Sequence, residues 1–232
     1  MITFDVVTLF PRLFTEHLNN LPFKRAIDNN VTKVNLWNLR DFAIDKRGTV
    51  DDKPFGGGVG MILMIEPIFK ALSSIYPERI GKSKSIDSSF LRLSKKSRIV
   101  VLSPRGKRYD QKLASELANM EQITLICGRY EGIDARVEKY LATDVISIGD
   151  YVVSGGELPA LVLMESIVRL QSGVLEKKEA TKNESFTKDF IEYPQYTRPG
   201  DFEGLKAPDV LLSGNHEEVE KWRKEQSRPL NN

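Results

Sequence analysis

The sequence contains one cysteine and two histidines, and these shortages exclude several kinds of site. Cys127 alone cannot form an internal disulfide, and it cannot supply the thiolates of a cysteine-built metal site. His17 and His216 are too few for a histidine-rich metal centre. No apolar run approaches the roughly 20 residues that a membrane-spanning helix requires. We therefore predict a protein without a metal centre of its own and without membrane contact.

Signals for export and for strong nucleic-acid binding are also missing. The stretch Met1 to Asp5 lacks the basic start and the small-residue cleavage site of a signal peptide, so we expect a cytoplasmic protein. Residues 1–174 carry a slight excess of positive charge and residues 175–232 a slight excess of negative charge. This balance allows a nucleic-acid partner but does not demand one.

What the chain does contain is a regular alternation of apolar runs and amphipathic segments. An early strand, helix, strand and helix are predicted at 1–9, 10–18, 33–42 and 65–76. Later strands are predicted at 98–104, 123–128 and 144–149, each followed by a helix, at 109–119 (capped by Asp110), 134–141 and 158–170. Such alternation is typical of an α/β domain with a parallel sheet and helices on both faces.

The loops that follow the three later strands are the candidate ligand site. In parallel sheets, ligands bind outside the carboxyl ends of the strands. Here those ends lead into residues 102–106, 127–134 and 147–156, all of which contain glycine. We therefore expect these three loops to converge on one site.

After Leu170 the sequence becomes polar and loses its apolar periodicity. We predict a first domain over residues 1–171, a flexible linker over 172–187 and a small, mostly helical C-terminal domain over 188–232, with a helix at 217–226. The last segment is too short to build a core of its own. A second segment, 80–98, is rich in serine and lysine and is predicted to be an exposed, partly mobile connector.

The glycine-bearing loop at 147–156 stands in an acidic setting. Between Tyr140 and Val168 there is no lysine or arginine, and the GKS or GKT of a P-loop is missing, which disfavours phosphate. Backbone amides and carbonyls approached through glycine suit a neutral or cationic nucleoside such as S-adenosylmethionine. The alternative is a tight turn with a capping box, Ser154 to Glu157, that merely starts a core helix.

A second glycine cluster, Gly56 to Gly60, does not qualify as a dinucleotide fingerprint. The polar stretch "RGTVDDKP" precedes it, where the fingerprint requires a buried strand. We interpret it as a flexible loop, and its distance from any substrate cannot be argued from spacing.

Eight short motifs occur in order along nearly the whole chain. They are "LFPRLF", "VDDKPFGGGVGM", "LSPRGKRYDQ", "CGRYEGIDARV", "SIGDYVVSGGELPA", "ESF", "YTRP" and "LLSGNH". Together they resemble the bacterial tRNA (guanine-N1)-methyltransferases of the SPOUT superfamily. The resemblance implies a C-terminal trefoil knot in the sheet domain, a homodimer whose active sites are shared between subunits, and methylation of N1 of guanosine 37 in tRNA, with no role for DNA.

The resemblance also implies which residues hold the cofactor S-adenosylmethionine and its product S-adenosylhomocysteine. Those that match the family's pattern are Leu102, Ser103, Pro104, Gly128, Glu131, Ile148, Gly149, Asp150, Tyr151, Val152, Val153, Gly155, Gly156 and Pro159. Glu131 matches a contact to the methionine end of the cofactor and a candidate ligand of Mg²⁺. A loop carboxylate of this kind is more often a helix cap.

The chemistry of the reaction asks for a carboxylate and a cation. N1 of neutral guanine carries a proton, so a base must remove it as N1 attacks, and a cation must stabilise the charge on O6. The family's base is the aspartate of an Asp-Ser-Phe motif, which here reads Glu184-Ser185-Phe186. Glutamate keeps the carboxylate but adds a methylene. We predict Glu184 as the base, with Asp189 and Glu192 as weaker candidates.

The remaining roles are likewise carried over from the family. Arg169 matches the arginine that stabilises charge on the guanine. Ser185, Tyr196 and Arg198 are predicted substrate contacts, and Arg198 suits a phosphate. Lys182, Lys188 and the connector at 82–98 are expected to help bind the tRNA backbone.

Three rival interpretations stay open at this point. One is a SPOUT enzyme that methylates a different RNA, although methylation of a 2′-hydroxyl would not use the linker carboxylate. Another is a non-catalytic RNA-binding or cofactor-sensing protein, which the departure at Glu184 keeps in play. The weakest is a nicotinamide dehydrogenase, because no fingerprint follows the first strand.

Overall fold

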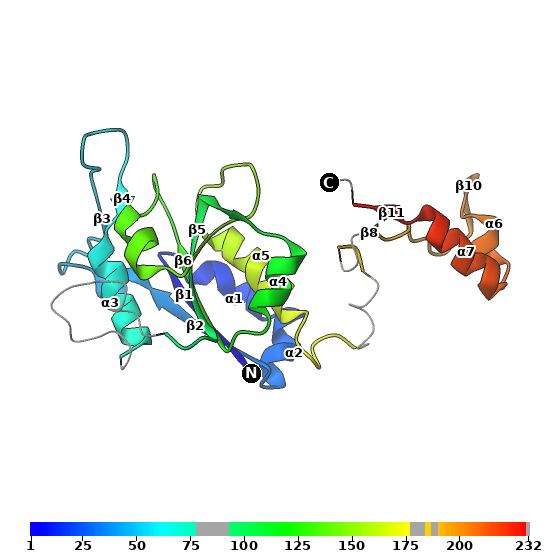
Figure 1. Cartoon of the computed structure of the whole chain (residues 1–232), viewed down its shortest axis with the longest axis horizontal. Helices are drawn as coiled ribbons and strands as arrows, with labels where there is room; N and C mark the ends of the chain where they lie inside the picture. Colours follow the sequence, from blue (N-terminus) through cyan, green and yellow to red (C-terminus); the bar gives the residue numbers. More distant parts are fainter. Residues whose placement is uncertain (78–92, 177–183, 187–189, 231–232) are drawn as a thin grey trace. The chain divides into compact units, whose positions relative to one another are not determined.

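The computed structural model describes residues 1–77, 93–176, 184–186 and 190–230. Within them the chain forms two compact units, Met1–Leu175 and Glu176–Asn232 (Figure 1). Most of the predicted connector at 80–98 lies outside the described residues, as do Lys182, Lys188 and Asp189. The linker and domain boundaries predicted from the sequence stay predictions. No helix in the described part of the chain is long and apolar enough to cross a membrane.

The first unit is built on a parallel sheet of five strands, in the order β2-β1-β6-β5-β7. The strands are β1 (Ile2–Thr8), β2 (Thr32–Asn38), β5 (Ser97–Arg108), β6 (Gln122–Cys127) and β7 (Asp144–Ser147). Their apolar residues reach the core on both faces, which is why their sequences read as nearly continuous hydrophobic runs. The parallel sheet predicted from the alternating pattern is confirmed.

Helices cover both faces of this sheet, as predicted (Figure 1). In β1, Phe4 and Val6 point into one hydrophobic cluster and Val7 into the other, which is the period of two expected of a strand. The first cluster is covered by α1 (Arg12–Leu18), α2 (Phe23–Asp28), α4 (Gln111–Leu117) and α5 (Glu157–Val168). The second is covered by η1 (Leu39–Phe42), α3 (Ile65–Ile75) and η2 (Val137–Leu141).

Several local predictions need correction. The strand predicted over 33–42 ends at Asn38, whose side chain accepts a hydrogen bond from the Arg40 amide at 3.1 Å and starts the 3-10 helix η1. The helix predicted over 134–141 is the short π-helix η2. Helix α2 and the two-residue strands β3 (Asp51–Asp52) and β4 (Ile62–Leu63) were not predicted, because elements this short carry little periodicity.

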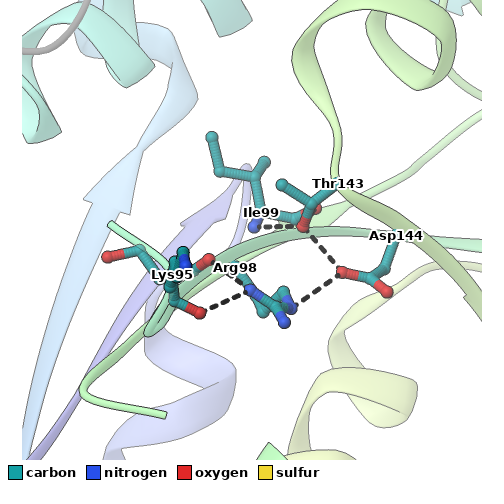
Figure 2. Close-up of polar contacts among 6 residues, drawn as sticks. Lys95, Arg98, Ile99, Thr143 and Asp144 are labelled. Atoms are coloured by element: carbon teal, nitrogen blue, oxygen red, sulfur yellow. Dashed lines mark hydrogen bonds and ion pairs between the residues drawn. The ribbon is translucent and has the colours of Figure 1, made fainter. Parts of the chain in front are cut away.

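Thr143 and Asp144, at the start of β7, contact Ile99 and Arg98 of β5 (Figure 2). The hydroxyl of Thr143 accepts a hydrogen bond from the Ile99 amide at 2.9 Å and lies 2.7 Å from a carboxylate oxygen of Asp144. Asp144 also faces Arg98, at 3.7 Å. These contacts set the register with which β7 enters the edge of the sheet next to β5.

The hydrogen bond that caps helix α4 can be tested by its effect on the free energy of unfolding. Asp110 accepts a hydrogen bond from the Leu113 amide at 2.7 Å, which confirms it as the N-cap. We expect Asp110→Ala to lower the free energy of unfolding by about 1 kcal/mol, or roughly 2 to 4 °C in Tm, because a helical N–H loses its acceptor. Asp110→Asn retains a capping oxygen and should stay near the parent in thermal unfolding. Equal Tm values for the alanine variant and the parent would contradict the capping role.

The second unit is small and thinly packed. It contains the paired strands β8 (Phe190–Ile191) and β11 (Arg228–Pro229), the pair β9 (Asp201–Phe202) and β10 (Leu205–Lys206), and helices α6 (Asp209–Leu212) and α7 (His216–Gln226). The ring of Trp222 lies 6.3 Å from that of Tyr193 and 6.2 Å from that of Tyr196. No described residue of the second unit is fully buried. Aromatic contacts therefore take the place of a closed core in this unit.

Candidate active site

The candidate site begins where β5 leaves its ladder with β7. The register between the two strands shifts between Leu102 and Lys107, so residues 103–106 depart from the regular ladder. At Gly106 the chain returns so close to β7 that a Cβ atom would collide with the backbone of Val145 and Ile146. Only glycine fits there. The shift opens a space at the carboxyl end of the sheet.

A cavity of about 530 Å³ occupies this space. It is lined by Val101 to Arg105 of β5, where the ladder with β7 becomes irregular, and by the loops after β6 and β7, so the predicted convergence of residues 102–106, 127–134 and 147–156 on one site is observed. The predicted cofactor residues that line it are Leu102, Ser103, Pro104, Gly128, Glu131, Ile148, Tyr151, Val152, Val153, Gly155, Gly156 and Pro159. Gly149 and Asp150 belong to the same loop but are not among the lining residues.

Gly156 brings the main chain of the last loop against the end of β6 and the residue that follows it. A Cβ atom on Gly156 would lie 2.7 Å from the Cα of Cys127 and 2.8 Å from the nitrogen of Gly128. The Gly156 amide donates a hydrogen bond to the Gly128 carbonyl at 2.8 Å. The two loops therefore meet through main chain at this point, and any side chain at position 156 would push them apart.

Each arginine that lines the cavity forms an ion pair with a glutamate. Arg105 donates two hydrogen bonds of 3.0 Å to the carboxylate of Glu138, and both residues line the cavity. Arg129 is paired with Glu157 at 2.8 Å. Glu131 lines the cavity with its side chain exposed. Since each lining arginine already faces a carboxylate, the site offers little to a phosphate group and favours a neutral or cationic ligand.

The second glycine cluster lies beside this cavity, which spacing alone could not show. The amide of Glu131 donates to the Met61 carbonyl at 3.0 Å, and the Leu63 amide donates to the Gly132 carbonyl at 2.9 Å. A Cβ on Gly60 would lie 2.5 Å from the Cγ of Glu131. The loop of residues 56–60 is thus attached by its C-terminal end to the loop after β6.

The sequence did not reveal the polar cluster of Thr8, Arg129 and Glu157, and it left open a capping box at Ser154 to Glu157 that is not formed. Glu157 is not part of a capping box, because its carboxylate is 1% exposed and accepts hydrogen bonds from Thr8 and Arg129 instead of returning to Ser154. The signal available was a glutamate at the start of an otherwise apolar helix. Thr8 and Arg129 gave no signal, since Thr8 lies 149 residues from its partner.

Cys127 lies under the cavity floor and is not a nucleophile. Its side chain is buried, and burial raises the pKa of the thiol well above its ordinary value, with the charge of Glu157 raising it further. The thiol therefore stays protonated at neutral pH. Among the described residues, no group of three or more His, Cys, Asp and Glu side chains has an arrangement that would hold a metal ion.

This geometry can be compared with known proteins. A family model described as tRNA (Guanine-1)-methyltransferase TrmD matches residues 2–230. The chain belongs to this family. The resemblance inferred from the eight motifs is thereby confirmed.

Curated relatives in the tRNA (guanine-1)-methyltransferase family match over nearly the whole chain. The tRNA (guanine-N(1)-)-methyltransferase of Clostridioides difficile (strain 630) is 44% identical over 224 residues, which are 97% of this chain and 91% of the relative. The protein of the same name from Dictyoglomus turgidum is 45% identical over 98% of this chain and 85% of its own. The protein of the same name from Staphylococcus carnosus is 46% identical over 96% of this chain and 84% of its own length.

The residues predicted from the motifs to act in catalysis and substrate binding fall in both units. Arg169 ends helix α5 in the first unit and is not among the cavity-lining residues. Glu184 and Ser185 belong to the second, where the Ser185 hydroxyl accepts a hydrogen bond from the Glu192 amide at 3.0 Å. Tyr196 packs against Trp222. The structure gathers the cofactor-loop residues, while the assembly of Arg169, Glu184, Tyr196 and Arg198 into one site stays a prediction.

Proposed function

We propose that this chain transfers a methyl group from S-adenosylmethionine to N1 of guanosine 37 in tRNA. The observation that carries the proposal is the cavity of about 530 Å³ between the irregular part of β5 and the loops after β6 and β7, in a member of the tRNA (guanine-1)-methyltransferase family. Pockets for small ligands commonly have volumes of about 300 to 1,000 Å³. The names of the curated relatives support the acceptor class, and motif resemblance supports position 37.

The lining residues fit S-adenosylmethionine chemically. Its adenine presents both hydrogen-bond donors and acceptors, and we assign main-chain amides and carbonyls of the lining loops as the complementary groups. Leu102, Ile148 and Val153 provide apolar surface for the ring. The sulfonium and ammonium charges suit a site whose arginines are already paired, with Glu131 at its edge. When bound, the cofactor supplies an electrophilic methyl group.

The acid–base chemistry falls to residues outside the cavity. We assign Glu184 as the base that takes the N1 proton, and Arg169 as the cation that stabilises negative charge on O6 of the guanine. Glu184 lies two residues before Phe186, whose amide donates a hydrogen bond to the Phe190 carbonyl at 2.8 Å. Glu184 stands where the family motif has aspartate, and its side chain is longer by one methylene, so it reaches further from the backbone.

The binding of tRNA is assigned to the second unit. The proposed substrate contacts are Tyr196 and Arg198, in a domain over 188–232, and Ser185, in the linker over 172–187 that leads to it. Arg198 supplies a positive charge for a phosphate, and Tyr196 supplies an aromatic face for stacking. The aromatic contacts of Trp222 support this role for Tyr196, because they keep its ring at the surface in a defined orientation.

A knotted chain and a homodimer complete the proposal. The shifted register of β5 against β7 and the close approach at Gly106 support a trefoil knot in this part of the sheet. Exposed apolar residues on α1 and α5, Leu13, Leu158 and Val162, support a second copy as the partner of this face. A tRNA substrate places the enzyme in the cytoplasm. Any Mg²⁺ at Glu131 would need water or ligand oxygens for the rest of its coordination shell.

Ligand-induced stabilisation tests the cofactor assignment. We expect S-adenosylmethionine and S-adenosylhomocysteine to stabilise the protein by about 2.7 kcal/mol at 100 times Kd, which is roughly 5 to 10 °C in Tm for a protein of this size. NAD at the same concentration should give no shift, because the site lacks free cations for its pyrophosphate. A shift with NAD and none with either sulfur nucleoside would overturn the assignment.

A further inference from the structure

Glu157 is the most deeply buried carboxylate near the cavity. It is the first residue of α5, and its side chain is 1% exposed. One carboxylate oxygen accepts a hydrogen bond from the Thr8 hydroxyl at 2.8 Å, and the other accepts one from Nε of Arg129 at 2.8 Å. Burying a charge is costly unless it is paired and hydrogen-bonded, so this carboxylate depends on both partners.

The two partners of Glu157 come from two other segments of the first unit. Thr8 ends β1, and its hydroxyl also accepts a hydrogen bond from the Phe10 amide at 2.9 Å. Arg129 follows β6, and its guanidinium lies 4.5 Å over the ring of Phe10. Arg129 also donates to the Ser154 carbonyl at 3.4 Å. The cluster therefore ties the end of β1 to the two glycine-bearing loops of the cavity.

The cluster also explains the glycine at position 155. A Cβ atom on Gly155 would collide with the guanidinium of Arg129 and would lie 2.6 Å from a carboxylate oxygen of Glu157. The ion pair thus packs directly against the backbone of the loop. One residue later, the Gly156 amide is bonded to the Gly128 carbonyl. Movement of the ion pair would shift both main-chain walls of the cavity together.

From these contacts we infer that Glu157, held by Thr8, is a positioning residue for the cofactor site. Neither residue lines the cavity, so neither can contact a ligand in it. They act through Arg129 and through the backbone from Gly155 to Gly156, and they fix the distance between the two loops. The inference rests on the proposed function, because it names the site that S-adenosylmethionine occupies.

Two substitutions test this role without touching the cavity lining. Thr8→Val keeps the shape of the side chain and removes the hydrogen bond to Glu157, and Glu157→Gln removes the charge. We expect each to weaken S-adenosylhomocysteine binding roughly 10- to 100-fold by calorimetry, since a misplacement of about 1 Å has effects of this order. The double variant should be no weaker than the worse single variant, because the two residues act as one unit.

A matched control separates positioning from general stability. Thr124 is also fully buried, and its hydroxyl lies 2.7 Å from that of Tyr76, away from the cavity lining. Thr124→Val therefore makes the same chemical change at a remote hydrogen bond. We expect it to lower Tm while leaving the Kd for S-adenosylhomocysteine within about 2-fold of the parent. Affinity for tRNA should be unchanged in Thr8→Val, because the proposed tRNA contacts Ser185, Tyr196 and Arg198 lie in the second unit and Arg169 is not among the residues that line the cavity.

Hydrogen exchange in the cofactor-free protein gives a readout that does not depend on the ligand. The amide of Gly156 should exchange faster in Thr8→Val than in the parent and in Thr124→Val, since its bond to Gly128 loosens. Parent-like exchange at Gly156 in a folded Thr8→Val protein would overturn the positioning role. So would equal losses of cofactor affinity in Thr8→Val and Thr124→Val. Failure of the parent protein to bind S-adenosylhomocysteine would instead overturn the proposed function. In that case, faster exchange of the Gly156 amide in Thr8→Val would still show that Thr8 and Glu157 position the two loops.

Discussion

Replacing Glu184 with glutamine is expected to lower the rate of methyl transfer to tRNA by about 10²- to 10⁴-fold, the range typical of general acid–base catalysis. Glutamine keeps the size of the side chain but cannot take the proton from N1 of guanine. Because the substitution removes a step in the reaction and no part of the cavity, the affinity for S-adenosylhomocysteine should not change. Single-turnover rates with saturating tRNA measure the effect on chemistry directly.

Two further variants make this result specific. Glu192 is a second glutamate close to Glu184 in sequence, and its backbone amide donates a hydrogen bond to the Ser185 hydroxyl. Glu192→Gln should leave the rate of methyl transfer near that of the parent. Glu184→Asp restores the residue of the family motif and should retain most of the activity. A Glu184→Gln enzyme as fast as the parent, or a Glu192→Gln enzyme as slow as Glu184→Gln, would move the base to another residue.

Adding a single methyl group at Gly156 is expected to weaken cofactor binding on the order of 100-fold. The Cβ of Gly156→Ala would lie 2.7 Å from the Cα of Cys127 and 2.8 Å from the nitrogen of Gly128, and backbone cannot rotate away as a side chain does. The two loops must then separate. Overpacking of this kind also costs about 1 to 3 kcal/mol of stability, so Tm should fall as well.

Gly200→Ala is the matched control for this substitution. Its Cβ would lie 3.2 Å from the Cδ1 of Leu212, a flexible side-chain end that can move, and it belongs to the second unit. We expect its affinity for S-adenosylhomocysteine to equal that of the parent in calorimetry. Cofactor binding by Gly156→Ala that matches the parent would show that the loop walls do not limit the site.

The sequence predicted the sheet and the place of the site because both depend on local patterns. The apolar runs of β5, β6 and β7 are continuous, and the carboxyl ends of parallel strands meet at one edge. The loops containing Leu102, Gly128 and Gly155 were therefore expected to converge, and they line one cavity. Asp110 could be recognised as a cap because its partner is only three residues away.

What the sequence did not predict depends on contacts between distant residues. The bond from Thr8 to Glu157 joins positions 149 residues apart, and a sequence pattern carries no trace of it. The attachment of the 56–60 loop to Glu131 likewise became visible only when β4 was placed next to the loop after β6. The alternative of a capping box at Ser154 to Glu157 does not hold, because the Glu157 carboxylate accepts hydrogen bonds from Thr8 and from the half-buried Arg129 instead.

The most direct test of the central claim is transfer of a labelled methyl group from S-adenosylmethionine to two tRNA transcripts. One carries guanosine at positions 36 and 37, and the other differs only by adenosine at position 37. The account predicts label on the first transcript alone, at N1 of guanosine 37. Equal labelling of both transcripts, or no labelling by a protein that binds the cofactor, would contradict it.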